Sequence, residues 1–336
     1  MPEIITLGEL LIDFVPTISG VSLMEAPAFK KAPGGAPANV AVGVSRLGIT
    51  SGFMGKVGDD AFGHFLAQTL GESGVDISAL QFSQQARTAL AFVSLTAEGE
   101  RDFLFYRHPS ADMLYSPEEV DPVYVQTGRI FHFGSITLID EPVRSATLKA
   151  LEIARAANLM VSYDPNLRLS LWPDAETARR RILQAWPLAH VIKVSAEELE
   201  FLSGEPTLEA GARRLWSAEQ RLLIVTVGKK GCVYFTTDGQ GATPGYTVEV
   251  VDTTGAGDGF VAGLLYGLAN SLRTGRPAWE DSGQLAAICR YANAVGALTT
   301  TQRGAIPALP SAAAVQAFMR AMETAESSKT NGETHG

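Results

Sequence analysis

Short hydrophobic runs alternate along most of the chain with longer segments in which apolar residues recur at helical spacing. The first run, residues 4–8, is followed by a glycine-rich turn and by a helical pattern with Pro37 in its first turn. Further runs of strand length lie at residues 129–134, 159–163, 190–194 and 221–226. Strand-length runs between helices are typical of βαβ units. The chain is therefore predicted to be an α/β protein with a central, mostly parallel sheet flanked by helices.

Residues 87–107 break this rhythm. Apolar residues occupy both faces of an alternating segment at 88–95, a turn is expected at 98–100, and residues 103–106 are hydrophobic and aromatic. A hairpin of this kind fits poorly into a parallel sheet. We expect a small β-sheet lid, formed by about residues 13–31 and 87–107, that packs on the main domain, on substrate or on a partner subunit.

The composition supports a sizeable core and limits the class of partner. Hydrophobic residues make up 46% of the 336 residues, and the formal net charge is −9. Lysines and arginines do not cluster, which argues against a nucleic-acid partner. No apolar run approaches the roughly 20 residues that a membrane span requires, and the N-terminus does not resemble a signal peptide. A cytoplasmic protein without membrane contact is expected.

Cysteine and histidine give no sign of a structural metal site. Cys232 and Cys289 stand in apolar surroundings without a C-x-x-C pattern, and the five histidines lack the spacing of metal ligands. The two cysteines are interpreted as reduced residues of the core.

The strongest candidate for chemistry is the sequence DTTGAGDGF at residues 252–260. Its small residues allow backbone N–H groups to converge at the start of a helix, where they can bind a group that gains negative charge. Asp258, directly behind this turn, could accept a proton from an attacking hydroxyl. Taken alone, Asp258 could equally be a helix cap. The segment is neither a P-loop nor a dinucleotide fingerprint.

Two weaker signals lie nearer the N-terminus. The segment APGGAPAN at residues 32–39 would allow a ligand to approach the backbone closely, with Asn39 as donor and acceptor. Asp13 follows the first strand, at the edge where ligands bind in open α/β sheets, and a carboxylate there suits sugar hydroxyls. In isolation, a surface turn and a solvated aspartate are the simpler explanation.

Other candidates also have structural explanations. Ser195 and Glu198 form a capping-box pattern, although Glu198 could also organise water around Mg²⁺. Residues 226–231 could be a hairpin turn or could lie along a nucleotide. Arg107 and Arg168 could form phosphate forks, although most arginines are simply solvated.

In combination and in order, these features resemble the ribokinase-like (PfkB) carbohydrate kinases over about residues 3–320. That family has an early Gly-Gly motif, here Gly34 and Gly35, and a late motif that matches residues 252–258. Within the family, the chain is most similar to fructokinases of plants and related bacteria. The stretches that carry this similarity are residues 7–17, 26–40, 109–114 and 163–168.

The resemblance implies a kinase domain at residues 1–323, a flexible polar tail at 324–336, and ATP-dependent phosphorylation of fructose. Asp258 would be the catalytic base, and Gly255, Ala256 and Gly257 the anion hole. The sugar would be held by Asp13, Gly34, Gly35, Asn39, Phe103 and Phe105, with Arg107 and Arg168 on sugar or phosphate. Lys193, Ser195, Glu198, Thr226, Gly228, Gly231 and Asn293 would lie along ATP and Mg²⁺, with Glu198 acting on the metal through water. A potassium ion would lie near Asp252, Thr254 and Gly304.

Some alternatives stay open. The acceptor could be 2-keto-3-deoxygluconate, ribose or a nucleoside, and a non-catalytic sugar-binding regulator is a more distant possibility. Ser195 stands where the family usually has asparagine, which weakens the role assigned to that residue. A homodimer formed through the lid is expected from the apolar residues on both faces of the hairpin.

Overall fold

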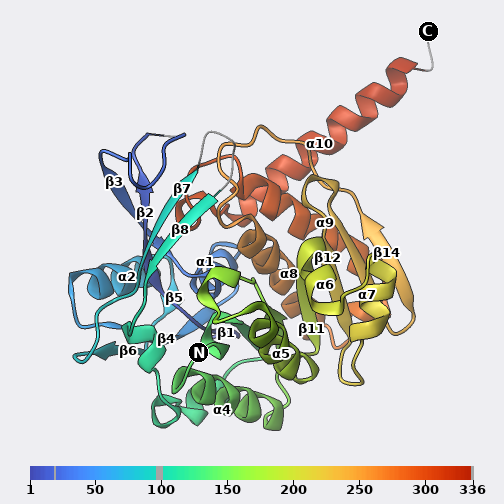
Figure 1. Ribbon diagram of the computed structural model, residues 1–336. Coiled ribbons are helices and arrows are strands. Elements are labelled where there is room, and N and C mark those ends of the chain that lie inside the picture. The colour runs from blue at the N-terminus through green and yellow to red at the C-terminus, as the bar shows by residue number, and fades with distance from the viewer. Residues whose placement is uncertain (19, 96–100, 334–336) are drawn as a thin grey trace.

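The computed structural model describes residues 1–18, 20–95 and 101–333 and contains two sheets (Figure 1). The larger sheet has the order β14-β13-β12-β11-β10-β9-β1-β4-β5, with β6 also pairing with β4. Neighbouring strands are parallel from β5 to β12, whereas β12, β13 and β14 are antiparallel. The prediction of a central, mostly parallel sheet flanked by helices is confirmed.

The strands of the larger sheet are β1 (Ile4–Leu7), β4 (Ser51–Gly58), β5 (Val75–Asp76), β6 (Leu80–Ser83), β9 (Ile130–Gly134), β10 (Met160–Asp164), β11 (Val191–Ser195), β12 (Leu222–Thr226), β13 (Cys232–Thr236) and β14 (Gly239–Thr243). The helices are α1 (Ala36–Arg46), α2 (Ala61–Glu72), α3 (Pro122–Gln126), α4 (Val143–Ala156), α5 (Ala175–Ala185), α6 (Ala196–Ser203), α7 (Leu208–Leu215), α8 (Ala256–Arg273), α9 (Ser282–Thr299) and α10 (Ala312–Glu333).

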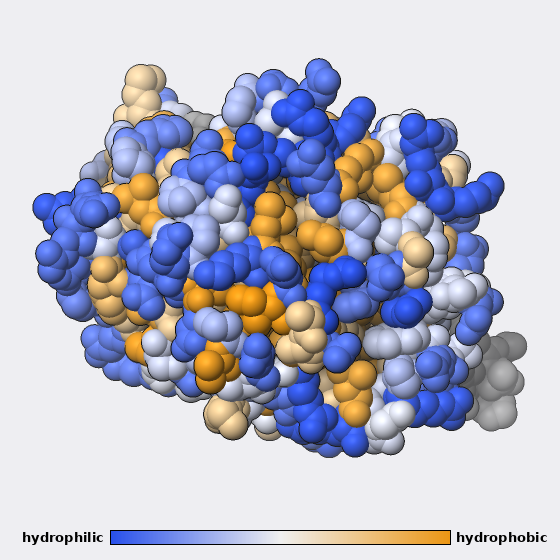
Figure 2. Space-filling model, turned by 90° about the horizontal axis from the view of Figure 1, so that it is seen from below, coloured by the Kyte–Doolittle hydropathy of each residue, from blue (hydrophilic) through white to orange (hydrophobic). Residues whose placement is uncertain are grey.

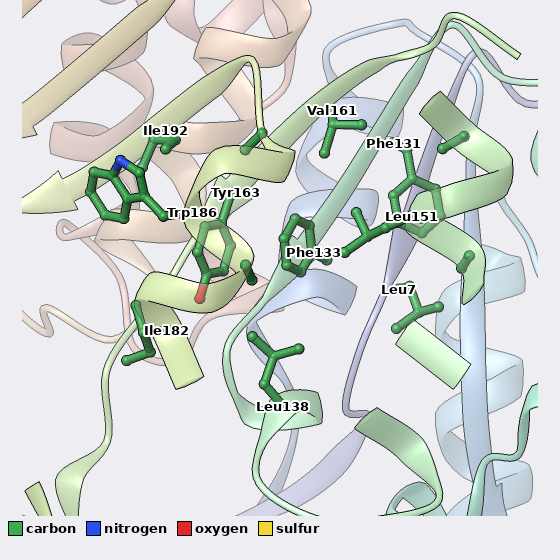
Figure 3. Packing of buried hydrophobic residues seen from close by; sticks show 14 of the residues in the cluster. Leu7, Phe131, Phe133, Leu138, Leu151, Val161, Tyr163, Ile182, Trp186 and Ile192 are labelled. Carbon is green, nitrogen blue, oxygen red and sulfur yellow. The ribbon is translucent and has the colours of Figure 1, made fainter. Parts of the chain in front are cut away.

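Consecutive strand residues enter two different cores. Ile5 packs with residues of α3 to α7, whereas its neighbour Ile4 packs with α1, α8, α9 and α10. Phe131 and Ile130 on β9 divide in the same way. Figure 3 shows the first of these cores, in which the stacked rings of Phe133 and Tyr163 lie 4.3 Å apart. Because side chains alternate across a strand, a run buried on both faces is hydrophobic throughout, which explains the continuous apolar runs of the sequence.

A second sheet of order β3-β2-β7-β8 stands apart from the first (Figure 1). Its strands are β2 (Leu11–Pro16), β3 (Phe29–Gly34), β7 (Leu90–Leu95) and β8 (Arg101–Tyr106). This finding confirms the expected small sheet. The two strands of the hairpin pair antiparallel, while the predicted turn at residues 98–100 lies outside the described residues.

One face of this small sheet is aromatic. Phe14 stacks on Phe92 at 5.0 Å, and Phe92 also contacts the ring edges of Phe29 and Tyr106. The aromatic face continues onto α2 through Phe62. Because alternate residues of a strand point to opposite faces, Asp13 lies on the other face of β2. The aromatic cluster thus fixes the lid strand that carries Asp13.

The C-terminal segment differs from the sequence expectation. A polar tail was expected from residue 324, yet α10 continues to Glu333 and projects from the body of the molecule (Figure 1). The first turns of α10 pack Val315, Phe318 and Met319 against the core formed with α8 and α9. Alanine, methionine and glutamate, which favour helix, continue the sequence beyond that contact, so the helix propagates from an anchored start.

Hydrophilic residues surround small groups of hydrophobic ones on the face seen from below (Figure 2). Such a mixture is usual, because apolar atoms contribute much of the surface of any folded protein. Among the described residues, no helix combines the length and the apolar character needed to cross a lipid bilayer.

The contact between α1 and α8 depends on a glycine. A Cβ placed on Gly43 would lie 2.5 Å from the Cβ of Ala262. Gly43→Ala is therefore expected to lower the free energy of unfolding by about 1–3 kcal/mol through overpacking, measured by urea denaturation. Gly71→Ala on α2 is the matched control, because its Cβ would meet nothing closer than 3.8 Å. Equal stability of the two variants would contradict the close contact.

Candidate active site

Helix α8 begins at the glycine-rich motif. Gly255 caps the helix with φ of 77°, and a Cβ at this position would lie 2.8 Å from the Cβ of Ala305. Both the left-handed backbone and the close neighbour require glycine here. The first N–H groups of a helix have no hydrogen-bond partner within the helix, so the N–H groups of Ala256 and Gly257 can donate to an anion. The N–H of Ala256 also makes a 3.3 Å contact with the backbone oxygen of Thr253. The structure thus places a helix start at the predicted motif, with Gly255 as its cap.

Asp258 lies in the first turn of α8 and is only 9% exposed. Its Oδ2 accepts a hydrogen bond of 2.7 Å from Nδ2 of Asn39, the side chain that sequence reasoning assigned to the sugar. Burial raises the pKa of Asp258 to about 6, although the bond from Asn39 opposes this rise. A carboxylate with this pKa is ionised at neutral pH and is a stronger base than an exposed aspartate.

A buried ion pair stands beside Asp258. Nζ of Lys193, on β11, lies 3.1 Å from Oδ2 of Asp164, at the end of β10, and both side chains are buried. A Cβ placed on Gly257 would be 3.3 Å from Nζ, which puts the ammonium at the predicted anion hole. Burial alone would lower the pKa of Lys193, but Asp164 and Glu198 outweigh it and raise the pKa. Lys193 therefore stays charged beside the first turn of α8.

Sequence reasoning did not select Asp164. The rule that selected Asp13, a carboxylate directly after a strand at the carboxyl edge of the sheet, applies equally to Asp164. Lys193 gives a second indication of Asp164, because a lysine inside an apolar strand needs a partner of opposite charge.

Asp13, which also interacts electrostatically with Asp258, lies against the backbone of Gly34. A Cβ on Gly34 would come within 2.2 Å of Oδ2 of Asp13, so only glycine leaves room for this carboxylate. Burial raises the pKa of Asp13 to about 7, and Asp258 contributes to the rise while Arg168 opposes it. Arg168 also lowers the pKa of Asp258. Asp13, Gly34, Arg168 and Asp258 are thus brought together as predicted.

The loop that carries Gly34 and Gly35 is fixed by a second buried carboxylate, Glu9. Gly35 has φ of 112°, and a Cβ there would lie 2.2 Å from the backbone oxygen of Glu9. The Oε1 atom of Glu9 accepts a hydrogen bond of 2.8 Å from the N–H of Ala36. Burial raises the pKa of Glu9 to about 7. Sequence reasoning missed Glu9, although it too follows the first strand.

Arg107 is not free in this structure. Its Nε donates to Oδ2 of Asp112 at 3.0 Å, its Nη2 contacts the same carboxylate, and the side chain is only 5% exposed. Ser110 also donates to Asp112. Arg107 is therefore held at the base of the lid, directly after β8.

The lid residues can be placed only in part. Ala91 pairs with Asp13 on one side and with Phe105 on the other, so these three residues lie in a row across the small sheet. Phe105 packs against Leu11, on the face that carries Asp13. Phe103 belongs to the same strand, but its side chain lies outside the described part of the chain.

The nucleotide-side candidates follow β11 and β12. Ser195 and Glu198 form the predicted capping box at the start of α6, and Oε1 of Glu198 also accepts from the N–H of Leu167 at 2.6 Å. Both carboxylate oxygens of Glu198 therefore already hold backbone groups, which suits contact with a metal through water better than direct ligation.

The turn after β12 is shaped by glycines. Gly228 and Gly231 both have positive φ, and Thr226 donates its hydroxyl to the backbone oxygen of Val194. Asn293 is more distant in sequence and braces the segment after β14, since its amide donates to Oγ1 of Thr243 and to the oxygen of Pro244. Asn293 thus holds the segment at Thr243 and Pro244 in place.

Asp252, Thr254 and Gly304 come together as predicted. Oδ1 of Asp252 accepts from the N–H of Thr254 at 2.9 Å, and Oδ2 accepts from the N–H of Gly304 at 2.9 Å. This carboxylate ties the loop before α8 to the loop before α10. Among residues 1–18, 20–95 and 101–333, no three His, Cys, Asp or Glu side chains gather as a metal-binding group.

The buried charge of Asp258 predicts a cost in stability. Its pKa in the folded protein, about 6, lies above the ordinary value of 3.8, so folding loses stability as pH rises through this range. Asp258→Asn should therefore be more stable than the wild type at pH 8, on the order of 1–3 kcal/mol, and the gain should shrink by pH 4.5. Urea unfolding at both pH values measures this. A gain of equal size at both would show that charge is not the cause.

Comparison with known proteins agrees with this geometry. Residues 1–312 match the model of the pfkB family carbohydrate kinases. Probable fructokinase-4 of Arabidopsis thaliana is 52% identical over 318 residues, which are 94% of this chain and 96% of the relative. Among solved structures, fructokinase with bound ATP from Xylella fastidiosa is 36% identical with a TM-score of 0.87, covering 96% of this chain and all of that one.

A second solved structure is a fructokinase double mutant from Vibrio cholerae O395 in a form with fructose, ADP and potassium ion bound. It is 37% identical, has a TM-score of 0.85, and covers 95% of this chain and 98% of that one. The family match over most of the chain, together with the identity to curated relatives, confirms the resemblance inferred from the motifs. The chain belongs to the pfkB family of carbohydrate kinases.

Proposed function

We propose that this protein is an ATP-dependent fructokinase, which transfers the γ-phosphoryl group of ATP to a primary hydroxyl of D-fructose to give fructose 6-phosphate. The observation that carries the proposal is the position of Asp258. It lies at the N-terminus of α8 and interacts electrostatically both with Asp13, which we assign to the sugar, and with Lys193, which we assign to the phosphate. The relatives named fructokinases support fructose as the acceptor.

In this mechanism Asp258 accepts the proton of the sugar hydroxyl as the oxygen attacks phosphorus. The N–H groups at the start of α8 and the ammonium of Lys193 stabilise the negative charge of the transferring group. Asp13 and the backbone at Gly34 orient the sugar hydroxyls. Closure of the small sheet over the sugar excludes water, which suppresses hydrolysis of ATP.

Two cations complete the proposal. Mg²⁺, held through water by Glu198, would neutralise the phosphate oxygens of ATP. A potassium ion would be held by the loops that Asp252 joins, with Thr254 and Gly304 supplying backbone oxygens. The relative crystallised with potassium ion supports the second assignment. Cys232 and Cys289 are both free and buried, which supports a reducing compartment such as the cytoplasm.

A panel of acceptors tests the proposed substrate. The coupled assay should give the highest kcat/KM with D-fructose and ATP, compared with 2-keto-3-deoxygluconate, ribose and nucleosides. A higher value for another acceptor would assign the protein to that substrate and keep the kinase mechanism. Absence of turnover with every acceptor would instead favour a sugar-binding regulator.

Replacement of the base tests the mechanism. Asp258→Asn should lose about 10²–10⁴-fold in kcat, because a positioned base contributes about that much to the rate. Circular dichroism should show an unchanged fold. Asp281→Asn is the control, because Asp281 caps α9 away from the site. An Asp258→Asn variant with kcat within a few-fold of the wild type would rule out the assigned base.

The small sheet also supports a homodimer. Leu104 and Tyr106 on β8 are 48% and 59% exposed, although both are large and hydrophobic. Pairing of two such sheets would cover them. Light scattering at micromolar concentration should give the mass of a dimer, and Leu104→Glu should shift it toward that of a monomer. A monomeric wild-type protein would contradict this assembly.

A further inference from the structure

The side chain of Asn39 joins the two glycine-rich motifs. It extends from the first turn of α1, and its Nδ2 donates to Oδ2 of Asp258 at 2.7 Å across 219 positions of sequence. Both side chains are buried, Asn39 at 4% and Asp258 at 9% exposure. A charge-assisted hydrogen bond of this length in a buried site is among the stronger polar contacts in proteins.

One turn after this hydrogen bond, α1 and α8 pack closely against each other, and this packing fixes the hydrogen bond. Gly43 follows Asn39 by four residues, and Ala262 follows Asp258 by four. The absent side chain of Gly43 lets Ala262 approach within 2.5 Å of the place where a Cβ would stand. Residues four apart lie on the same face of a helix, so this close packing aligns the two polar side chains above it.

The hydrogen bond distinguishes the two oxygens of Asp258. Oδ2 is taken by Asn39, and no hydrogen bond to Oδ1 is found within the described residues. Fixing one oxygen sets the rotation of the carboxylate, and the other oxygen is left to take the proton. Among the described residues, Oδ1 of Asn39 is buried without a hydrogen-bond partner.

We propose that Asn39 is a positioning residue for phosphoryl transfer, which holds Oδ2 of Asp258 so that Oδ1 faces the hydroxyl of the acceptor. This role differs from the sugar contact that the sequence suggested for Asn39. The inference rests on the proposed function, because it takes Asp258 to be the base.

The electrostatic surroundings support the same role. The charged groups that interact with Asp258 are Asp13 on β2, Asp164 on β10, Arg168 after β10 and Lys193 on β11. Against burial and the charge of Asp164, the bond from Asn39 is the largest influence that lowers the pKa of Asp258. Loss of the donor should therefore raise the pKa of the base further above 6.

The test is the pH dependence of kcat in Asn39→Leu, which has similar size and no donor. The acid limb of the pH profile of kcat should move to higher pH by about one unit, so that the deficit relative to wild type is about fivefold larger at pH 6 than at pH 8.5. Loss of a sugar contact alone would raise KM for fructose and leave the limb in place. An acid limb at the wild-type position would overturn the proposal.

Asn270→Leu is the matched control, because Asn270 also lies on a helix, α8, and donates its amide to a backbone oxygen, that of Tyr266. Its acid limb should coincide with that of the wild type. Asn39→Gln, which keeps the donor on a longer side chain, should recover part of the wild-type profile. If the acid limb of Asn39→Gln moves as far as that of Asn39→Leu, the lost hydrogen bond is not the cause of the shift.

A measurement without catalysis covers variants that turn over too slowly. Urea unfolding at pH 8 of the wild type, Asn39→Leu, Asp258→Ala and the double variant forms a cycle, in which each single change removes the hydrogen bond. The two changes should be non-additive, because the bond can be lost only once, and additivity would contradict the contact. If Asp258→Asn keeps its activity, the proposed base is wrong. If it is inactive and the limb of Asn39→Leu does not move, only the role of Asn39 is wrong.

Discussion

The contact between α1 and α8 is the constraint on which the site depends. Each helix begins directly after a glycine with positive φ, Gly35 for α1 and Gly255 for α8. Their close packing at Gly43 and Ala262 sets the separation of these two beginnings. A shift of one helix along the other would part Asn39 from Asp258 and separate the loop at Gly34 and Gly35 from the start of α8. The arrangement of Asn39 and Asp258 therefore depends on the apolar contact between Gly43 and Ala262, one helical turn away.

Much of the fold follows from patterns that are local in the sequence. Continuous apolar runs identified the buried parallel strands, because each run feeds two cores at once. The capping box at Ser195 and Glu198 is likewise a local device, and it was found for that reason. The extent of α10 was misjudged, because a polar composition does not reveal that a helix is anchored by Val315 at its first turns.

The candidate site was less accessible to sequence reasoning wherever it depends on contacts between distant segments. Asp258 was found from its motif and Lys193 from the family resemblance, but the counter-ion Asp164 and the link from Asn39 depend on contacts between distant segments. Arg107 shows the same limit: a basic residue after an aromatic strand suggested a phosphate ligand, whereas its partner Asp112 holds it at the base of the lid. Charge type can be read from a sequence, but the partner of a charge cannot.

The separation of the two sheets has a consequence for how such enzymes diversify. In the proposed mechanism, recognition of the acceptor draws on β2, β3 and β8 of the small sheet, while the base and the anion hole belong to α8. Mutations in the small sheet can therefore alter which alcohol is accepted without touching the groups that move the proton. Selection can act on the two tasks one at a time, and a single scaffold can give rise to enzymes for many different sugars.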